Sequence, residues 1–276
     1  MEIRQLSTVQ EYRDCEETMK KIWEFTDRDI IPSHVLKPIQ DQGGLVLGAF
    51  ENEEMVGVLV GFLGYYKGIL HHHSHVTGVL NQYKEIGYKL KQRQREFALS
   101  QGLNLVTWTF DPLQSSNAYF NFAKLGVVSN VYHRDYYGEM RDGLNKGLSS
   151  DRLLVEWWIT SENVLQRVKK NFEQPKLDEI TAGIVNKTQK DIFRTPGDIN
   201  LGLIHDTVLV EIPSDINVIK AHNIECAQTW RKVTRDIFET YFSKGYTACN
   251  VISEFRKGER RTFYVLRKDY HENQKN

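Results

Sequence analysis

The stretch that most constrains the fold runs from residue 68 to residue 110 and combines a strand pattern, a helix pattern and a second strand pattern. The first segment, GILHHHSHVTGVL, is rich in residues that suit a pleated strand. A helical segment follows and ends near Gly102, before the second strand LNLVTWTF. Because strands joined by a crossover helix are parallel neighbours, this order predicts an α/β protein with a helix packed on its sheet.

The flanking segments extend this α/β order in both directions. Residues 7–25 and 33–42 have helical patterns, and Thr8 and Glu11 have the spacing of a capping box. Residues 43–66 predict a hairpin around ENEE, and residues 131–140 predict a further strand. The Gly/Asp/Ser-rich connector RDGLNKGLSSDR predicts a boundary between a first domain, 1–145, and a C-terminal α+β domain, 146–276. Beyond it we expect charged helical stretches in 162–204, one long helix over 216–243 and closing strands.

Composition narrows the class of function. Lys+Arg and Asp+Glu both total 36 in 276 residues, so the chain lacks the basic field that nucleic-acid binding normally needs. The three cysteines form no CxxC motif, which argues against a disulfide framework or a zinc site. The N-terminus is too charged for a signal peptide, and no apolar run approaches the roughly 20 residues that span a membrane. We therefore expect a cytoplasmic protein that binds neither nucleic acid nor membrane.

The basic start of the helix after residue 80 indicates either a solvated surface or an anion site. Its cations are Lys84, Lys89, Lys91, Arg93 and Arg95. Cations are normally unfavourable at a helix N-terminus, whereas free amides there attract phosphate. Gly87 would let the backbone approach a ligand. One hypothesis is therefore a pyrophosphate-binding turn assisted by Lys84, Lys89 and Lys91, and the alternative is an ordinary basic helix face.

The histidine run in the preceding strand also has two interpretations. Strand alternation would put His71, His73 and His75 on one face, and His72, Ser74 and Val76 on the other. Imidazole titrates near pH 7, so His73 or His75 could act as a general base. The alternative is that these histidines have no catalytic task. No acidic or thiol ligand nearby supports a metal site, and none is expected.

Several segments resemble the GNAT superfamily of acyl-CoA-dependent N-acyltransferases. The turn QYKEIG is similar to the superfamily's Q/R-x-x-G-x-G/A motif through Gln82 and Gly87, with Glu85 in place of its first glycine. NAYFNFAKLGV, residues 117–127, is similar to its second conserved helix. Residues 103–152 and the C-terminal TWRKVTRDIFETYFSKGY resemble a branch of predicted bacterial GNAT proteins, some of which are linked to amino-acid N-succinylation.

This resemblance implies a fold and a reaction. The fold would be a GNAT-like central mixed sheet flanked by helices, and the C-terminal half could be a degenerate second such unit. The activity would be transfer of an acetyl or succinyl group from acyl-CoA to a small-molecule amine, such as an amino acid, with the thioester oxygen held by a strand amide. The residues implied in binding acyl-CoA are Val79, Leu80, Gln82, Lys84, Gly87, Tyr88, Lys89 and Asn117.

The remaining site residues follow the same implication. The position of the superfamily's tyrosine general acid holds Phe122, so Tyr119, one turn earlier, is the candidate acid beside the base His75 or His73. Asp111 could pair with a substrate ammonium, and Arg134 with a carboxylate, as could Arg141. For Asn117, capping a helix is the alternative to contacting CoA. Glu85 and Phe122 favour a rival function, a non-catalytic acyl-CoA-binding or interaction protein, and a homodimer is one option for assembly.

Overall fold

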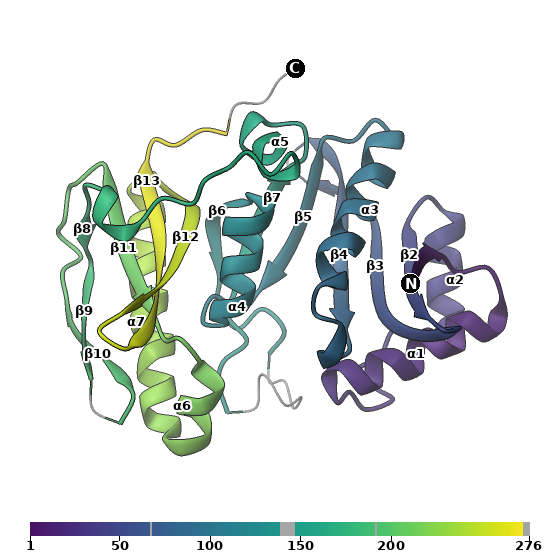
Figure 1. The fold of residues 1–276 in the computed structure, drawn as a ribbon, viewed down its shortest axis with the longest axis horizontal. Helices are drawn as coiled ribbons and strands as arrows, with labels where there is room; N and C mark the ends of the chain where they lie inside the picture. The colour runs from purple at the N-terminus through teal and green to yellow at the C-terminus, as the bar shows by residue number, and fades with distance from the viewer. Residues whose placement is uncertain (67, 139–146, 191, 273–276) are drawn as a thin grey trace. The chain divides into compact units, whose positions relative to one another are not determined.

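The computed structural model describes residues 1–66, 68–138, 147–190 and 192–272 (Figure 1). Contacts divide them into two compact units, the first comprising 1–108 and the second 109–138 with 147–272. The predicted domain boundary after residue 145 lies outside the described residues and stays a prediction. Among the described residues, no helix is both long enough and apolar enough to cross a membrane.

The first unit is a mixed sheet with helices on both faces. Its strands lie in the order β1-β2-β3-β4-β5, with antiparallel pairing from β1 to β4 and parallel pairing of β4 with β5. This pairing confirms the predicted parallel crossover, although the sequence analysis missed β1. The elements are β1 (Glu2–Gln5), α1 (Val9–Trp23), α2 (Ser33–Asp41), β2 (Leu45–Glu51), β3 (Glu54–Tyr66), β4 (Ile69–Val79), η1 (Asn81–Tyr83), α3 (Ile86–Ser100) and β5 (Leu105–Phe110).

Local signals account for most boundaries in this unit. Thr8 and Glu11 form the predicted capping box at the start of α1. Asn52 and Glu53 have φ angles of 48° and 70°, as a tight two-residue hairpin turn between β2 and β3 requires. Gly102, with φ of 74°, follows the end of α3. The helices and the hairpin predicted for residues 7–66 are confirmed.

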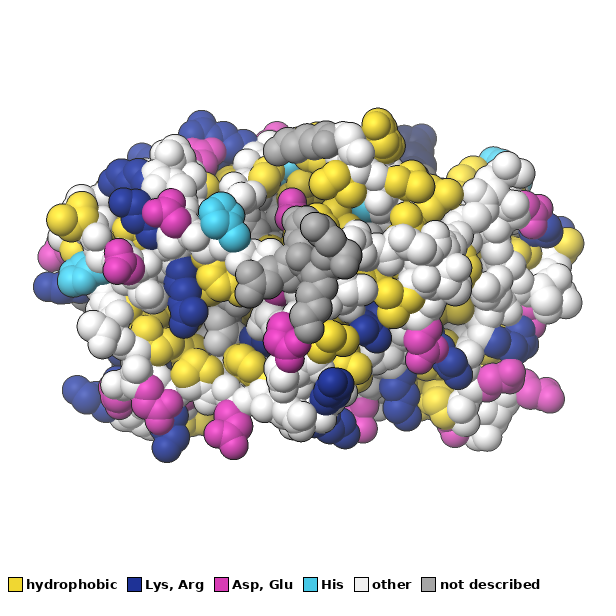
Figure 2. All heavy atoms as spheres, turned by 90° about the horizontal axis from the view of Figure 1, so that it is seen from above, with side chains coloured by type: hydrophobic (Ala, Val, Ile, Leu, Met, Phe, Trp, Pro, Cys, Tyr) yellow, Lys and Arg dark blue, Asp and Glu magenta, His cyan; other side chains and the backbone are white. Residues whose placement is uncertain are grey.

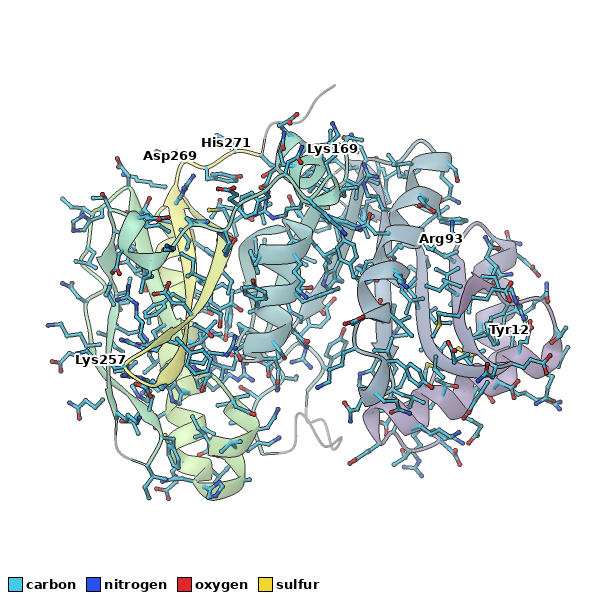
Figure 3. All side chains as sticks on the ribbon, viewed as in Figure 1. Tyr12, Arg93, Lys169, Lys257, Asp269 and His271 are labelled. Carbon is cyan, nitrogen blue, oxygen red and sulfur yellow. The ribbon has the colours of Figure 1, made fainter. Side chains whose placement is uncertain are left out.

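The two faces of this sheet are covered by different helices. Helices α1 and α2 cover one face, where Met19, Leu36 and Val58 belong to a core cluster that also contains Tyr12 (Figure 3). Helix α3 covers the other face, where Ile86 and Leu90 join Leu59 in a second cluster. This arrangement, with helices on both sides of one sheet, is the predicted mixed α/β fold class.

Strand β4 contains a β-bulge at His75. Ser74 is paired with Gly61 and Val76 with the adjacent Val60, so His75 is an extra residue on β4. The bulge reverses the alternation of side chains beyond it. Val76 consequently packs on the cluster under α1, not on the face of His72 and Ser74. The predicted alternation is therefore wrong at Val76, because one inserted residue shifts every later side chain to the opposite face.

The second unit contains a sheet of strands in the order β7-β6-β12-β13-β11-β8 and a separate β10-β9 ribbon. Helix α7 packs on this sheet, with the Phe238 ring centroid 5.0 Å from that of Tyr264, and its Trp230 Nε1 donates to Arg194 O on the ribbon. The elements are α4 (Ser115–Ala118), the π-helix η2 (Tyr119–Leu125), β6 (Val128–His133), β7 (Arg152–Trp158), α5 (Glu162–Val168), η3 (Leu177–Glu179), β8 (Gly183–Ile184), β9 (Asn186–Lys190), β10 (Arg194–Ile199), β11 (Thr207–Ile212), α6 (Ile216–His222), α7 (Ile224–Ser243), β12 (Tyr246–Arg256) and β13 (Glu259–Lys268).

Three expectations for this unit are corrected. The strand predicted over 131–140 is β6, which ends at His133, and turns follow it. The stretch 162–204 contains three strands where charged helices were expected, with α5 as its one α-helix among the described residues. The predicted long helix is divided at Asn223, whose backbone is extended and whose side chain accepts a hydrogen bond from Cys226 N to cap α7.

Candidate functional site

The turn between β4 and α3 lies at the carboxyl end of a sheet strand, where α/β folds commonly bind ligands. Leu80 N donates to Val56 O at 2.9 Å, and Tyr83 N donates to Leu80 O at 2.8 Å, so η1 continues directly from the strand. Val79 and Leu80 are half-buried and pack against the cluster that contains Ile86. The turn is thereby held by the core, while its tip remains at the surface.

The side chains at this tip are available to a ligand. Gln82, Lys84 and Lys89 are exposed, and Tyr88 is half-buried, with its pKa raised by burial. Neither Lys84 nor Lys89 forms an ion pair with any carboxylate among the described residues. Gly87 lies in the first turn of α3, and a Cβ placed there would meet nothing within 4 Å.

The start of α3 also lacks a side-chain cap. Glu85 at the cap position makes no capping hydrogen bond, and its side chain is exposed. A helix start without a side-chain cap and two exposed ammonium groups suit an anion, whereas the exposed Glu85 carboxylate opposes one. The turn is therefore a candidate anion site formed by Lys84, Lys89 and the open backbone at Gly87.

The remaining cations of the basic run have other surroundings. Arg93 is exposed and pairs with Glu96 at 2.9 Å (Figure 3). Lys91, which was predicted to assist the phosphate site, is 2% exposed and lies against the sheet, so that prediction is wrong. On the face of the molecule in Figure 2, acidic and basic side chains are interspersed, in agreement with the equal totals of 36.

His73 and His75 both lie next to the Phe62 ring, and their own ring centroids are 6.4 Å apart. The Phe62 ring centroid is 5.2 Å from that of His73 and 5.8 Å from that of His75. His73 Nδ1 is 3.0 Å from Thr107 Oγ1. Desolvation lowers the pKa of His73 to about 4 and also lowers the pKa of His75. Both imidazoles are therefore neutral near pH 7 and able to accept a proton, and His75 is the exposed member of the pair.

The sheet face under α3 carries a buried polar cluster that the sequence analysis missed. We call His72, Ser74, Lys91 and Gln94 the polar inlay. Lys91 Nζ donates to Ser74 Oγ at 3.1 Å and to Gln94 Oε1 at 2.8 Å, and it lies 3.6 Å from the centroid of the Trp108 ring. Burial lowers the pKa of Lys91 well below its usual value. The signal in the sequence is Gln94, which occupies an apolar position in the series 86, 90, 94 and 98 on the inner face of α3.

The inlay ends at His72. Gln94 accepts from Lys91 through its oxygen, so its nitrogen faces His72 Nδ1 at 3.1 Å and donates to it. Desolvation lowers the pKa of His72 to about 3, which keeps this ring neutral with its proton on Nε2. Among the described residues, His72 Nε2 has no hydrogen-bond partner.

Tyr119 and Asn117 lie in the second unit. Tyr119 is the half-buried first residue of the π-helix η2, a type of helix often found at functional sites. Asn117 is exposed and inside α4, whose cap position is Gln114, so Asn117 does not cap this helix. Phe122 is fully buried, with its ring centroid 5.5 Å from that of Tyr264. Phe122 therefore belongs to the core, and Tyr119 remains the candidate acid in this segment.

The predicted substrate residues form ion pairs within the second unit. Both carboxylate oxygens of Asp111 accept from Arg231, at 2.8 and 2.7 Å, and both side chains are buried. Asp111 is thus engaged by a cation of the chain itself, which contradicts an assignment to a substrate ammonium. Arg134 is exposed and binds both oxygens of Glu239, and Arg141 lies outside the described residues. Arg231 and Arg235, both on α7, bind Asp111 and Asp151, respectively.

Two cavities of the second unit contain none of the predicted site residues. One, of about 310 Å³, is lined by Phe193, Arg194 and Glu259 among others. The other, of about 160 Å³, is lined by Glu156, Trp158 and residues 270–272 among others. Within the described residues, no group of three or more His, Cys, Asp or Glu side chains is arranged to hold a metal ion.

Comparison with known proteins gives similarity in shape alone. No family model and no curated protein matches the chain. An aminoglycoside 6'-acetyltransferase type Ii is 16% identical, with 58% of this chain and 97% of that chain covered and a TM-score of 0.46. A GNAT-family acetyltransferase from Streptococcus pneumoniae is 18% identical, with 56% and 96% covered and a TM-score of 0.44. The ribosomal-protein-S18-alanine N-acetyltransferase from Escherichia coli is 14% identical, with 59% and 97% covered and a TM-score of 0.44.

Proposed function

We propose that this protein is an acyl-CoA-dependent N-acyltransferase that transfers an acetyl or succinyl group to an amine, and that the acceptor is a small molecule such as an amino acid. The observation that carries the proposal is the β4–α3 turn. It combines exposed Lys84 and Lys89, open space at Gly87 and a helix start without a side-chain cap. These features suit the diphosphate of CoA.

Within this proposal, the chain's residues bind the donor and take up a proton. Lys84, Lys89 and the amides near Gly87 hold the diphosphate, Gln82, Tyr88 and Asn117 supply further contacts, and a backbone amide of Val79 or Leu80 polarises the acyl oxygen. Bound acyl-CoA supplies an acyl group activated as a thioester.

An amine attacks only when neutral, so a base must remove its extra proton. His75 has an exposed, neutral imidazole suited to this task, and His73 lies next to the same Phe62 ring. Tyr119 is proposed to return a proton to the departing thiolate. Because desolvation lowers the pKa of both histidines, the acid limb of the pH profile should lie below pH 6.5.

The test is binding followed by turnover. Thermal shifts with acetyl-CoA, succinyl-CoA and CoA are measured first, and release of CoA thiol with amino acids of both hands is measured second. Replacing Lys84 and Lys89 with Ala should weaken CoA binding about tenfold and reduce its salt dependence. The matched control replaces Lys20 and Lys37, two lysines on α1 and α2, and so removes the same charge. Unchanged affinity in the first double variant would remove the diphosphate assignment.

A second candidate function is binding of acyl-CoA without catalysis. The exposed Glu85 carboxylate at the turn and the absence of a proton donor at Phe122 favour it. This function predicts a thermal shift with acyl-CoA and no amine-dependent release of CoA. Loss of turnover in His75→Gln or Tyr119→Phe, with binding retained, would exclude it.

A further inference from the structure

The bulge in β4 brings together two side chains that a regular strand would place on opposite faces. In a regular strand, side chains three residues apart point to opposite faces of the sheet. Ser74 Oγ and Thr77 Oγ1 are nevertheless 3.3 Å apart. This contact requires the extra residue that the register places at His75, since the insertion brings Thr77 to the same face as Ser74. The Ser74–Thr77 contact therefore spans the bulge on the α3 side.

Lys91 is hydrogen-bonded to Ser74, one of the two residues in this contact. Its Nζ lies 3.1 Å from Ser74 Oγ, and the same nitrogen meets Gln94 Oε1 and the face of the Trp108 ring. Ser74 Oγ accepts from Lys91, and it shares a second hydrogen bond with Thr77 Oγ1 in which either hydroxyl can donate. Lys91 thus orients the hydroxyl that connects the two sides of the bulge.

Packing alone does not account for a lysine at this position. The side chain is 2% exposed, and removing an amine from water has a large free-energy cost unless its donors are satisfied. An apolar side chain of similar length would occupy the same space without that cost. What the amine provides is a directed hydrogen bond to Ser74, the residue immediately before the bulged His75.

We propose that Lys91 is a positioning residue that acts through Ser74 to hold the β4 bulge and so fixes the direction of the His75 imidazole. The proposal deepens the proposed function, because His75 is its general base. His73 has a separate support, since its Nδ1 contacts Thr107 Oγ1 on β5. Loss of Lys91 should therefore disturb His75 more than His73.

The experiment is designed around the strand itself, so that it does not depend on turnover. Lys91→Met removes the donor at similar side-chain length, and Ser74→Ala removes the oxygen that Lys91 and Thr77 share. In both variants, amide hydrogen exchange at residues 75–77 should accelerate about tenfold or more, which corresponds to about 1.4 kcal/mol of local opening. The NMR signals of the His75 imidazole should also move.

Two controls separate positioning from general damage. Ser74→Thr keeps the hydroxyl and should restore the exchange rates of the original protein. Arg93→Met removes an exposed cation two residues further along α3 and should change neither measurement. If folded Lys91→Met or folded Ser74→Ala shows original exchange rates at residues 75–77 and unchanged His75 signals, the proposal is overturned.

Turnover then tests the link to catalysis. With an active protein, Lys91→Met should lower kcat, shift the acid limb of the pH profile and leave KM for acyl-CoA nearly unchanged. Burial lowers the pKa of His75, whereas His75, His71 and Lys91 also face His73, so a shift of that limb reports a change in the surroundings of the two imidazoles. Without activity in the original protein, the proposed function fails while the exchange measurement still decides the role of Lys91. Unchanged kcat and pH profile would contradict the catalytic part of the proposal.

Discussion

The two faces of the first sheet bury different kinds of side chain. Under α1 and α2, buried Met19, Leu36 and Val60 form an apolar core. Under α3, the apolar cluster around Leu90 gives way to the polar inlay, where Lys91 and His72 are almost fully buried. Apolar contacts are non-directional and stabilise the fold wherever side chains fill the space. Buried polar groups, by contrast, are tolerated only in specific hydrogen-bonding geometries. The first face therefore supplies stability, and the second specifies the local shape of β4.

The N-termini of α1 and α3 also differ, because only α1 has a side-chain cap. α1 begins with a complete capping box, in which Thr8 and Glu11 satisfy each other's backbone amides. α3 begins without a side-chain cap at Glu85. A helix N-terminus with a side-chain cap has fewer backbone amides available to a ligand than one without a cap. The difference separates a stabilising helix from one that is suited to binding.

The largest expected effect is from Gly61→Ala, on the face of the inlay. A Cβ at this position would lie 2.3 Å from His72 Cε1 and 2.8 Å from His73 O, so the His72 ring or the strand must move. We expect a loss of about 3 kcal/mol or more in the free energy of unfolding, measured by urea titration. His72→Ala should relieve part of this loss in the double variant, because it removes the nearer contact. Additive losses would show that the inlay does not set the space at Gly61.

A smaller effect is expected from acid at the start of α1. The hydrogen bond from Arg4, with further bonds from Ser7 and Thr8, lowers the pKa of Glu11 to about 2, from an ordinary value of 4.5. Because the folded pKa is depressed, the stabilisation is present above pH 4.5 and is lost as the pH falls toward 2. After allowance for solvent screening, we expect about 1 to 2 kcal/mol.

The measurement is urea unfolding at pH 6 and pH 3 for the original protein and for Glu11→Gln. The variant should be less stable at pH 6 and should lose less stability between the two pH values. An equal loss in both proteins would place the acid sensitivity at carboxylates other than Glu11.

The smallest expected effect on stability is from Gly87→Ala in the first turn of α3. No atom lies within 4 Å of the new Cβ, so the helix should gain up to about 0.5 kcal/mol from the better propensity of alanine. If the backbone at Gly87 approaches a diphosphate, the affinity for CoA should nevertheless fall. A stabilised variant with reduced CoA affinity would show that the start of α3 serves binding and not stability. Unchanged affinity would remove Gly87 from the site.

Sequence patterns were sufficient for features whose causes lie within a few residues. The capping box of α1, the turn at Asn52 and Glu53 and the parallel crossover through α3 follow from local propensity and from connection rules. The same patterns brought the helix start with Lys84, Lys89 and Gly87 to attention as a candidate anion site. They failed at β10 and its neighbours, because short, polar strands have weak patterns of their own.

The amino-acid sequence by itself determined the order of most elements and the crossover that makes the first sheet mixed. Only the tertiary structure decided that β4 bulges at His75, that Lys91 turns inward to Ser74, and that Asp111 pairs with Arg231 across 120 residues of sequence. Helix caps and turns depend on neighbours along the chain, whereas a bulge or a buried charge depends on the strands and side chains packed around it. Those partners are set by the fold and cannot be recognised from local spacing.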